Sequence, residues 1–543
     1  MMNINRIDYR ANKLPDTISG KQIKEEPIEL HGKDTVTLSV PVTLDIDGKS
    51  VEKKINCEVS DKEITLHMKH TNDVHGNMPS VATIIKPDEF WVDAGDAWQD
   101  YTFHSIVSAG REEAELMNLR GCDIAVPGNH FYDDGGVPSA EKIIEMSDFP
   151  YISSNIKGMA PYVIAEVEGI KLAFIGTRTP RKRFGMVDPS LVKDLNITEP
   201  LEPLKKSVEE VRAKGIKNVI VISHLGLEPT EEHKDIISDK EVAQKIPGID
   251  LIIGGHTHTP TKDSISVNGT RIVQAGPGGH GDPKTDALYI GDLSMTFDRN
   301  TGKITSINHN LLSVDRSNIS DKDVQDIHGK YVEEEKRILQ EKLGIAEGDF
   351  THEIKTPVDS TLGNLITDAM RKETGADIAM VDSNFFFEDG KDMKPNLLPH
   401  GEITMKNLTE VSPWNGKSQD TRVETWPVKG EDIKKLLEDG VSKLLGPKKH
   451  HGLFQVSGLS MSYDPSAPEG ARVTQVMVGD KPLDTNKNYN LTTSFYVGNW
   501  NSIFGGRDEN TVTDGRKLRA IVADYIKDAA SISPVQEGRI KVQ

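Results

Sequence analysis

The sequence predicts an α/β protein with more than one domain. From residue 63 to about 315, runs typical of buried strands alternate with amphipathic helical patterns, as in layered α/β domains. The chain has 543 residues, which is too long for a single hydrophobic core. A charged helical stretch precedes a second apolar region. We therefore expect a first domain over residues 63–315, a helical linker over 316–347 and a second domain over 348–543.

Residues 1–62 are expected to form an N-terminal extension with a β-hairpin. Residues 1–24 are polar. The segment TVTLSVPVTLDI then alternates apolar and polar residues, turns at Asp47-Gly48 and resumes as VEKKINCEV, which is a hairpin pattern. We expect this hairpin to be a small appendage that packs on the first domain.

Three helical patterns in the first domain each lead into a strand pattern. SIVSAGREEAELMNLRG precedes CDIAVPG, PLEPLKKSVEEVRAKG precedes KNVIVISH, and SDKEVAQKIPG precedes IDLIIGGH. In such folds, ligands bind on the loops that follow the strand ends. In the second domain, TLGNLITDAMRKETGADIAMVD and EDIKKLLEDGVSKLL contain the helical patterns.

Composition and charge exclude several function classes. The net charge of −19 argues against binding a nucleic-acid polymer, because neutralising phosphates requires surplus Lys and Arg. The first 30 residues lack the apolar segment of a signal peptide, and no run approaches the roughly 20 apolar residues of a membrane span. Cys57 and Cys122 are expected to be buried thiols. We therefore expect a cytoplasmic protein that does not bind membranes; its oligomeric state is not predicted.

Five short clusters of potential metal ligands lie in order along the first domain. Each follows a run typical of a buried strand, so that carboxylates, one amide and several imidazoles all stand where strands end. One such cluster alone would indicate only a loop, but five such clusters in order indicate a common site. The clusters are Asp73-Val-His75, Gly95-Asp96, Gly128-Asn129-His130, Ser223-His224 and Gly254-Gly255-His256-Thr257-His258.

This ligand set predicts a hydrolytic site with two divalent metal ions. Two ions about 3.5–4 Å apart can hold the attacking and leaving oxygens of an in-line displacement, and they supply hydroxide by lowering the pKa of a bound water. Imidazole with oxygen ligands suits zinc, manganese, iron or cobalt better than magnesium or calcium. Asp96 is the candidate bridging ligand; Asp73, His75 and His258 complete one metal site, and Asn129, His224 and His256 complete the other.

His130 and Asp133 are candidates for catalysis. His130 directly follows the candidate ligand Asn129. An imidazole beside a metal-bound phosphate can stabilise charge or protonate the leaving oxygen. Asp133 can accept the other ring N–H of His130 and fix its orientation.

The clusters resemble those of the calcineurin-like metallophosphoesterases, residue by residue. With the two-domain layout, the chain resembles the bacterial 5′-nucleotidase/UDP-sugar hydrolase/2′,3′-cyclic phosphodiesterase family: TNDVHG and VPGNHFYDDG resemble its first-domain motifs. The resemblance implies a four-layer α/β/β/α metallophosphoesterase domain followed by a 5′-nucleotidase-type C-terminal α/β domain. It also implies the ligands named above and a catalytic dyad of His130 and Asp133. The chain departs from the family at Phe131-Tyr132, where the family has Glu-Phe.

The second domain resembles the family's substrate-binding domain, which holds a nucleoside between two aromatic rings. Trp414 and Phe495 stand where these rings are expected, and base stacking contributes about 1–3 kcal/mol per base. Asn384 is a candidate hydrogen-bonding partner for a base or sugar. The family's arginine is absent from this region, which instead contains three consecutive Phe residues. The resemblance therefore predicts the reaction more closely than the substrate.

Together these features predict a metal-dependent phosphoester hydrolase of the 5′-nucleotidase type. Its partner would be a small phosphate ester such as a nucleotide. One alternative is an enzyme resembling the thiosulfohydrolase of sulfur oxidation, and another is a non-catalytic binding protein on a nucleotidase scaffold. The family is often periplasmic or extracellular, whereas the missing signal peptide favours the cytoplasm.

Overall fold

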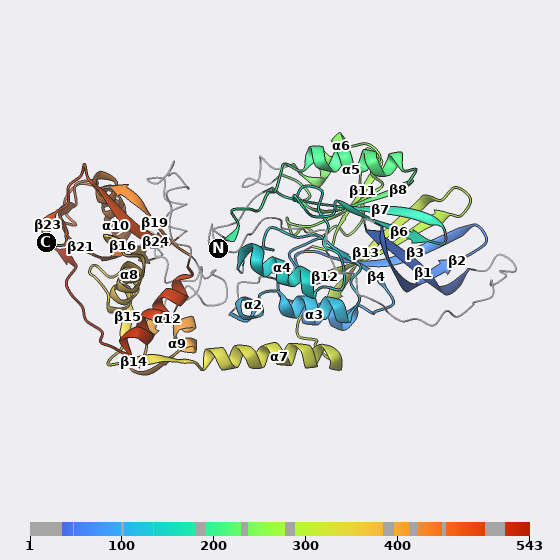
Figure 1. Ribbon diagram of the computed structural model, residues 1–543. Coiled ribbons are helices and arrows are strands. Elements are labelled where there is room, and N and C mark those ends of the chain that lie inside the picture. The colour runs from blue at the N-terminus through green and yellow to red at the C-terminus, as the bar shows by residue number, and fades with distance from the viewer. Residues whose placement is uncertain are drawn as a thin grey trace, which may run out of the picture. The chain divides into compact units, whose positions relative to one another are not determined.

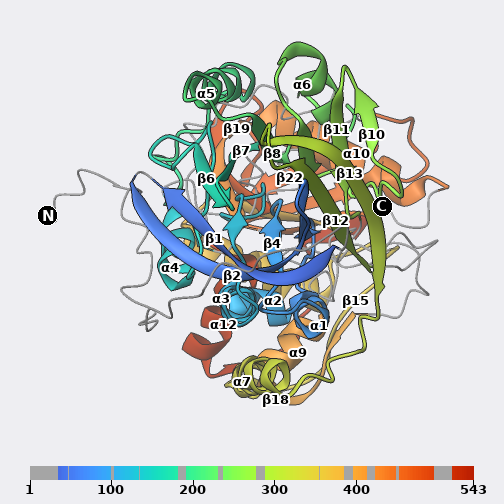
Figure 2. The ribbon, with the colours of Figure 1, turned by 90° about the vertical axis from the view of Figure 1, so that its right-hand side faces the viewer.

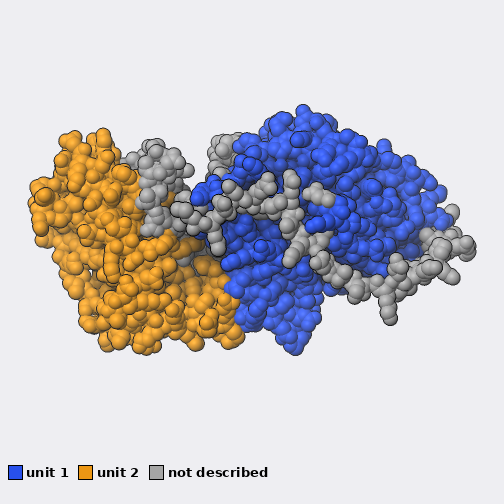
Figure 3. All heavy atoms as spheres, in the orientation of Figure 1, with its two compact units in different colours: residues 1–100, 108–183, 191–331 blue, residues 101–107, 184–190, 332–543 orange. Residues whose placement is uncertain are grey.

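The computed structural model divides into two compact units, coloured separately in Figure 3. The first comprises residues 1–100, 108–183 and 191–331, and the second comprises 101–107, 184–190 and 332–543. No helix among the residues described is both long and apolar enough to cross a membrane. The structure describes residues 35–46, 48–98, 103–133, 135–180, 191–229, 237–276, 288–353, 355–383, 396–411, 422–447, 452–494 and 516–543.

The elements up to residue 339 alternate between strands and helices over most of their length. They are β1 (Val36–Ile46), β2 (Lys49–Val59), β3 (Glu63–Thr71), α1 (Met78–Ile84), β4 (Phe90–Asp93), α2 (Phe103–Ser108), α3 (Arg111–Leu119), β5 (Ile124–Ala125), α4 (Gly136–Met146), β6 (Tyr162–Val167), β7 (Ile170–Arg178), α5 (Leu201–Ala213), β8 (Asn218–His224), α6 (Asp239–Lys245), β9 (Leu251–Gly254), β10 (Ile265–Val267), β11 (Thr270–Gln274), β12 (Leu288–Asp298), β13 (Lys303–Val314) and α7 (Lys322–Leu339).

The strands of the first unit form one hydrogen-bonded sheet that folds over on itself. Its order is β10-β11-β9-β8-β7-β6-β1-β2-β3-β12-β13, with β4 paired to β3 and β5 paired to β4. One hydrophobic core joins residues from both halves, among them Leu66 of β3, Phe174 of β7 and Met295 of β12. The two halves therefore pack face to face as a sandwich.

Helices cover both outer faces of this sandwich. In Figures 1 and 2, α5 and α6 lie on one side of the strands and α3 lies on the other. Leu204 and Val208 of α5 and Val242 of α6 pack against Ala173 and Val221 of the sheet in a second core. The expected four-layer α/β/β/α arrangement is therefore confirmed.

The N-terminal hairpin is part of the sheet and not a separate appendage. Strands β1 and β2 pair antiparallel from Val36↔Val59 to Ile46↔Lys49. Strand β1 also pairs with β6, and β2 also pairs with β3. Strand edges carry unpaired N–H and C=O groups, so the hairpin satisfies the edges of β6 and β3 and links the two halves of the sandwich.

The second unit has its own sheets and two hydrophobic cores. Strands β19, β24, β16 and β20 form one sheet, and β23, β22, β21 and β26 form another. Helices α8 and α12 share one core, and α10 packs in the other. The remaining elements are β14 (Lys342–Ala346), β15 (Phe350–His352), α8 (Thr361–Thr374), β16 (Ile378–Asp382), β17 (Asn396–Leu398), β18 (Gly401–Thr404), α9 (Met405–Glu410), β19 (Val423–Lys429), α10 (Gly430–Leu445), β20 (Phe454–Ser457), β21 (Leu459–Tyr463), β22 (Val473–Val478), β23 (Lys481–Pro482), β24 (Asn488–Ser494), α12 (Leu518–Ala529), β25 (Ser531–Ile532) and β26 (Ile540–Val542).

A buried histidine pair joins β3 to β13. The Nε2 atoms of His70 and His309 are 3.0 Å apart, and their rings stack at 5.1 Å. Gly291 of β12 makes room for them, because a Cβ there would lie 1.8 Å from His70 Nε2. Burial lowers the pKa of His309 to about 4, although Asp292 and Asp263 oppose this shift. Burial, and then His309, lower the pKa of His70 well below its ordinary value.

We predict that His309 makes the protein less stable as the pH falls. Its pKa is about 4 when folded against the ordinary 6.5, so the unfolded chain binds the proton first. The contribution of neutral His309 to the unfolding free energy is fully present above about pH 6.5. It decreases on acidification, by roughly 2 kcal/mol at about pH 5. The variant His309→Leu should therefore lose less unfolding free energy than the wild type between about pH 7 and pH 5. Urea unfolding in a chelator measures this, and equal losses in both proteins would contradict it.

Candidate metal centre

The five ligand clusters lie at the ends of strands, or just after them, at one edge of the sandwich. Strands β3, β4 and β5 run parallel, as do β8 and β9, and parallel strands bring the residues after their carboxyl ends together. Hydrogen bonds join the clusters to one another: Asp73 N to Gly95 O (2.9 Å), His130 N to Asp96 Oδ1 (3.0 Å), His256 N to Asp73 Oδ2 (2.8 Å) and His224 Nδ1 with Ala94 O (2.7 Å).

The carboxylate of Asp73 lies at the middle of this site and is fully buried. Its Oδ2 accepts hydrogen bonds from Asn72 Nδ2 at 2.6 Å and from the His256 backbone. Its Oδ1 has no hydrogen-bond donor among the described residues. Three imidazole Nε2 atoms surround that oxygen, those of His258 at 3.3 Å, His75 at 3.9 Å and His224 at 3.9 Å.

This arrangement fits a bound divalent cation. A buried carboxylate oxygen without a donor is costly unless it is paired with positive charge or coordinates a metal. Two groups of three side chains each bring their ligand atoms within 4.8 Å of one another, and Asp73 belongs to both. The groups are Asp73 with His75 and His258, and Asp73 with Asp96 and His224.

Asp96 and Asn129 contact His224 from the other half of the sandwich. His224 Nε2 lies 2.9 Å from Asp96 Oδ2 and 3.2 Å from Asn129 Oδ1. The ring of His256 lies 5.2 Å from that of His224. All seven residues predicted as ligands therefore lie at this edge, and the role of Asp96 as the bridging ligand stays a prediction.

His130 and Asp133 form a close pair beside these groups. His130 Nδ1 lies 2.5 Å from Asp133 Oδ2, and both side chains are buried. The ring of His130 lies 5.5 Å from that of His75. A carboxylate at Nδ1 fixes the orientation of an imidazole, so the pair has the geometry of an oriented acid–base group.

Burial and the neighbouring charges together set the pKa values in the site. Burial alone would lower the pKa of His224, but Asp96 and then Asp73 raise it to about 9. Burial raises the pKa of Asp73, yet His258 and His224 bring it below its ordinary value. Burial and His258 lower the pKa of His75 to about 3. His224 and the carboxylates thus compensate one another's burial, whereas burial prevails at His75.

Candidate ligands account for most of the unusual backbone conformations. Among the described residues, nine non-glycine residues have positive φ. Such conformations are strained and cluster at functional sites. Five of the nine are predicted ligands: Asp73 (51°), His75 (44°), Asp96 (57°), His256 (78°) and His258 (51°).

Two glycines allow the loops that carry the candidate ligands to approach one another closely. A Cβ on Gly128 would lie 1.8 Å from Asp96 Oδ1. A Cβ on Gly255 would lie 2.9 Å from Ala94 O and 3.0 Å from His224 Nδ1. Side chains at these positions would push the clusters apart.

Several buried polar residues of the site were not identified from the sequence. Asn72 holds Asp73, and its Oδ1 accepts a hydrogen bond from Ala275 N at 2.8 Å. Arg178 is buried beside the Tyr132 ring, 5.8 Å from its centre, and donates from Nε to Thr179 O. The position of Asn72 directly before a candidate ligand was a usable signal. Nothing local marks Arg178 in the sequence.

The three residues predicted to bind substrate, Asn384, Trp414 and Phe495, lie outside the described residues. Their roles stay predictions.

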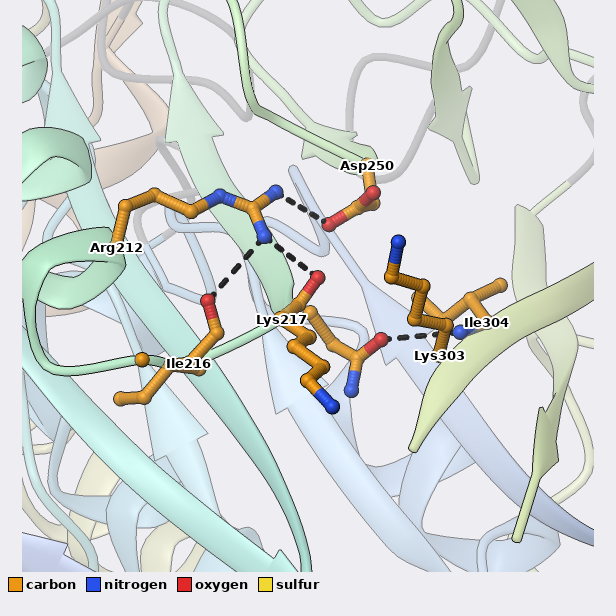
Figure 4. Close-up of a pocket in the computed structure, with 8 residues that line it drawn as sticks. Arg212, Ile216, Lys217, Asp250, Lys303 and Ile304 are labelled. Carbon is orange, nitrogen blue, oxygen red and sulfur yellow. Dashed lines mark hydrogen bonds and ion pairs between the residues drawn. The ribbon is translucent and has the colours of Figure 1, made fainter. Parts of the chain in front are cut away.

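A separate hollow of about 510 Å³ lies at the opposite end of β8 from the metal ligands (Figure 4). Arg212 of α5 lines it and donates to Ile216 O, Lys217 O and Asp250 Oδ2. Its guanidinium thus holds the loops before β8 and β9, which is a structural role.

Comparisons with known proteins assign both halves of the chain. Residues 66–260 match the calcineurin-like phosphoesterase family, and residues 342–504 match the 5′-nucleotidase C-terminal domain. Endonuclease YhcR of Bacillus subtilis is 27% identical over 84% of this chain, which spans 37% of that protein's length. Snake venom 5′-nucleotidase of Gloydius brevicauda is 26% identical over 83% of this chain and 79% of that protein.

A solved structure supports the fold. The NAD nucleotidase NadN of Haemophilus influenzae aligns with 89% of this chain and 99% of its own, with a TM-score of 0.57 and 18% identity. At this identity the likeness concerns the fold alone.

We predict that Gly128→Ala disrupts metal binding. The new methyl group would overlap Asp96 Oδ1 and force that carboxylate out of the site. The dissociation constant for divalent metal, measured by calorimetry, should rise at least about tenfold. Gly329→Ala on α7 is the control, because a Cβ there meets nothing within 4 Å and alanine favours a helix by about 1 kcal/mol. Unchanged metal affinity in Gly128→Ala would contradict the prediction.

Proposed function

Because the chain belongs to the 5′-nucleotidase family of calcineurin-like phosphoesterases, we propose that it hydrolyses phosphoester bonds of nucleotides or related small phosphate esters, using two divalent metal ions. The family makes the chain a hydrolase rather than a non-catalytic binding protein. The observation that carries the proposal is the buried Oδ1 of Asp73, with three imidazole Nε2 atoms within 3.9 Å.

The candidate ligand atoms suit two transition-metal ions that accept both nitrogen and oxygen ligands. The set contains two carboxylates, one amide oxygen and four imidazoles, a mixture that suits zinc, manganese, iron or cobalt. When bound, the ions would lower the pKa of a water molecule and neutralise phosphate oxygens. We propose Asp96 as the shared ligand, Asp73, His75 and His258 for one ion, and Asn129, His224 and His256 for the other.

We propose His130 as the residue that assists the leaving oxygen. Asp133 holds its Nδ1 at 2.5 Å, which fixes the ring and assigns proton exchange with the substrate to Nε2. The backbone N–H of His130 also donates to Asp96 Oδ1 at 3.0 Å. The position of the proton-transferring ring is therefore tied to a candidate metal ligand.

A small substrate is favoured over a nucleic-acid polymer. The net charge of −19 opposes the approach of a polyanion, whereas a local cationic centre can still hold one phosphate group. We propose that Trp414 and Phe495 stack the base and that Asn384 hydrogen-bonds it. The relative YhcR is named an endonuclease, so polymers belong in the test.

A substrate screen tests this proposal directly. Mononucleotides, cyclic nucleotides, dinucleotides, UDP-sugars and single-stranded DNA and RNA are each incubated with manganese, zinc or cobalt. We expect metal-dependent phosphate release from at least one small ester, little cleavage of the polymers and none in a chelator. No turnover of any small ester with any of the metals would contradict the proposal.

We predict that His130→Asn lowers kcat without removing metal. Loss of a positioned acid–base group typically costs about 10²–10⁴-fold, and Asn keeps the polarity of the buried position. Metal stoichiometry should equal that of the wild type. His67→Asn is the matched control, because His67 lies on β3 with its side chain 44% exposed beside Glu58. Equal kcat values for the two variants would argue against the role of His130.

A further inference from the structure

Along the loop that carries His256 and His258, residues with a strained backbone alternate with residues that Gln274 hydrogen-bonds. His256 and His258 have positive φ, and such conformations persist only where the surroundings impose them. The residues before, between and after them are Gly255, Thr257 and Thr259. The side chain of Gln274, at the end of β11, contacts all three.

Both the nitrogen and the oxygen of the Gln274 side-chain amide form hydrogen bonds with this loop. Nε2 donates to Gly255 O at 3.1 Å. Oε1 accepts from Thr257 Oγ1 at 3.5 Å and from Thr259 N at 3.4 Å. Gln274 is fully buried, so these bonds are made without competition from bulk water.

Asp239, the first residue of α6, connects Gln274 to the fourth ligand cluster. Its Oδ1 accepts from Ser223 Oγ at 2.5 Å, next to His224. Its Oδ2 accepts from Gln274 Nε2 at 3.4 Å. A Cβ on Gly254 would lie 2.2 Å from that Oδ2 and 2.8 Å from Gln274 Nε2, so the glycine is required for these groups to meet.

We propose that Gln274 and Asp239 form a brace that positions the imidazoles of His256, His258 and His224 for metal binding. The brace acts through the backbone and through Ser223, and neither of its members is itself a proposed ligand. This inference rests on the proposed function, because the positioned groups are the proposed metal ligands.

The end of β11 also holds the first cluster, on the other half of the sandwich. Ala275 N donates to Asn72 Oδ1 at 2.8 Å, and Asn72 Nδ2 donates to Asp73 Oδ2 at 2.6 Å. Two consecutive residues, Gln274 and Ala275, thus connect to ligand clusters from both halves. Loss of the Gln274 amide should loosen residues 254–259 while the bond from Ala275 to Asn72 remains.

The test is Gln274→Met, which keeps the length of the side chain and removes its hydrogen bonds. We expect the dissociation constant for Mn²⁺ to rise about 10–100-fold, as for other residues that orient metal ligands. In metal-free protein, hydrogen–deuterium exchange of a peptide covering residues 254–262 should become at least about tenfold faster.

The matched control is Thr270→Val at the start of the same strand. It removes a buried hydroxyl that donates to Ile249 O at 2.8 Å, far along the strand from the ligand loop. It should change neither the Mn²⁺ affinity nor the exchange of residues 254–262. If Gln274→Met does not fold, Thr257→Val removes one bond of the brace and should shift both measurements in the same direction by a smaller factor.

The brace would be overturned if residues 254–262 of Gln274→Met exchange at the wild-type rate. If Gln274→Met does not fold, the same outcome in Thr257→Val would overturn it. If the wild type binds Mn²⁺, an unchanged Mn²⁺ affinity in the variant used would also overturn it. If the wild type binds no divalent metal but exchange is faster in the variant, the brace stands as a loop-positioning device and the proposed function fails. A failure of the brace can therefore be told apart from a failure of metal binding.

Discussion

The burial of one carboxylate, that of Asp73, constrains the whole candidate site. A buried negative charge is costly unless donors and cations surround it. One oxygen is satisfied by Asn72 and by the backbone of His256, and the other faces three imidazoles. These partners come from the loops after β3 and β9 and from the last residue of β8, so the charge is compensated only when both halves of the sandwich are assembled. Folding and site formation are thereby linked.

The geometry of the site requires backbone strain at several ligands and glycines at two close contacts. Five candidate ligands adopt positive φ, and Gly128 and Gly255 allow contacts that a Cβ would block. Strain of about 1–3 kcal/mol per residue persists only in a rigid setting. The folded-over sheet supplies that setting, with the hairpin β1-β2 closing it between β6 and β3.

Much of the fold and the candidate ligands could be predicted because their signals are local. Each ligand stands directly after a strand pattern, and parallel strands bring such residues to one edge. The position of the hairpin in the sheet could not be predicted, since its sequence indicates a hairpin but not which edges it completes. Gln274, Asp239 and Arg178 were missed for the same reason: their partners are distant in sequence, and a single buried polar residue carries no period or motif. The substrate residues Asn384, Trp414 and Phe495 remain predictions from resemblance.

We propose that the Asp73 and Asp96 loops assemble a two-metal centre. The most direct measurement is electron paramagnetic resonance of the full chain titrated with Mn²⁺. Two Mn²⁺ ions close enough to share a carboxylate are magnetically coupled. We therefore expect the signal of isolated Mn²⁺ to be lost as two equivalents bind, and the signal of a coupled pair to replace it. Binding of a single uncoupled ion, or of none, would contradict the proposal.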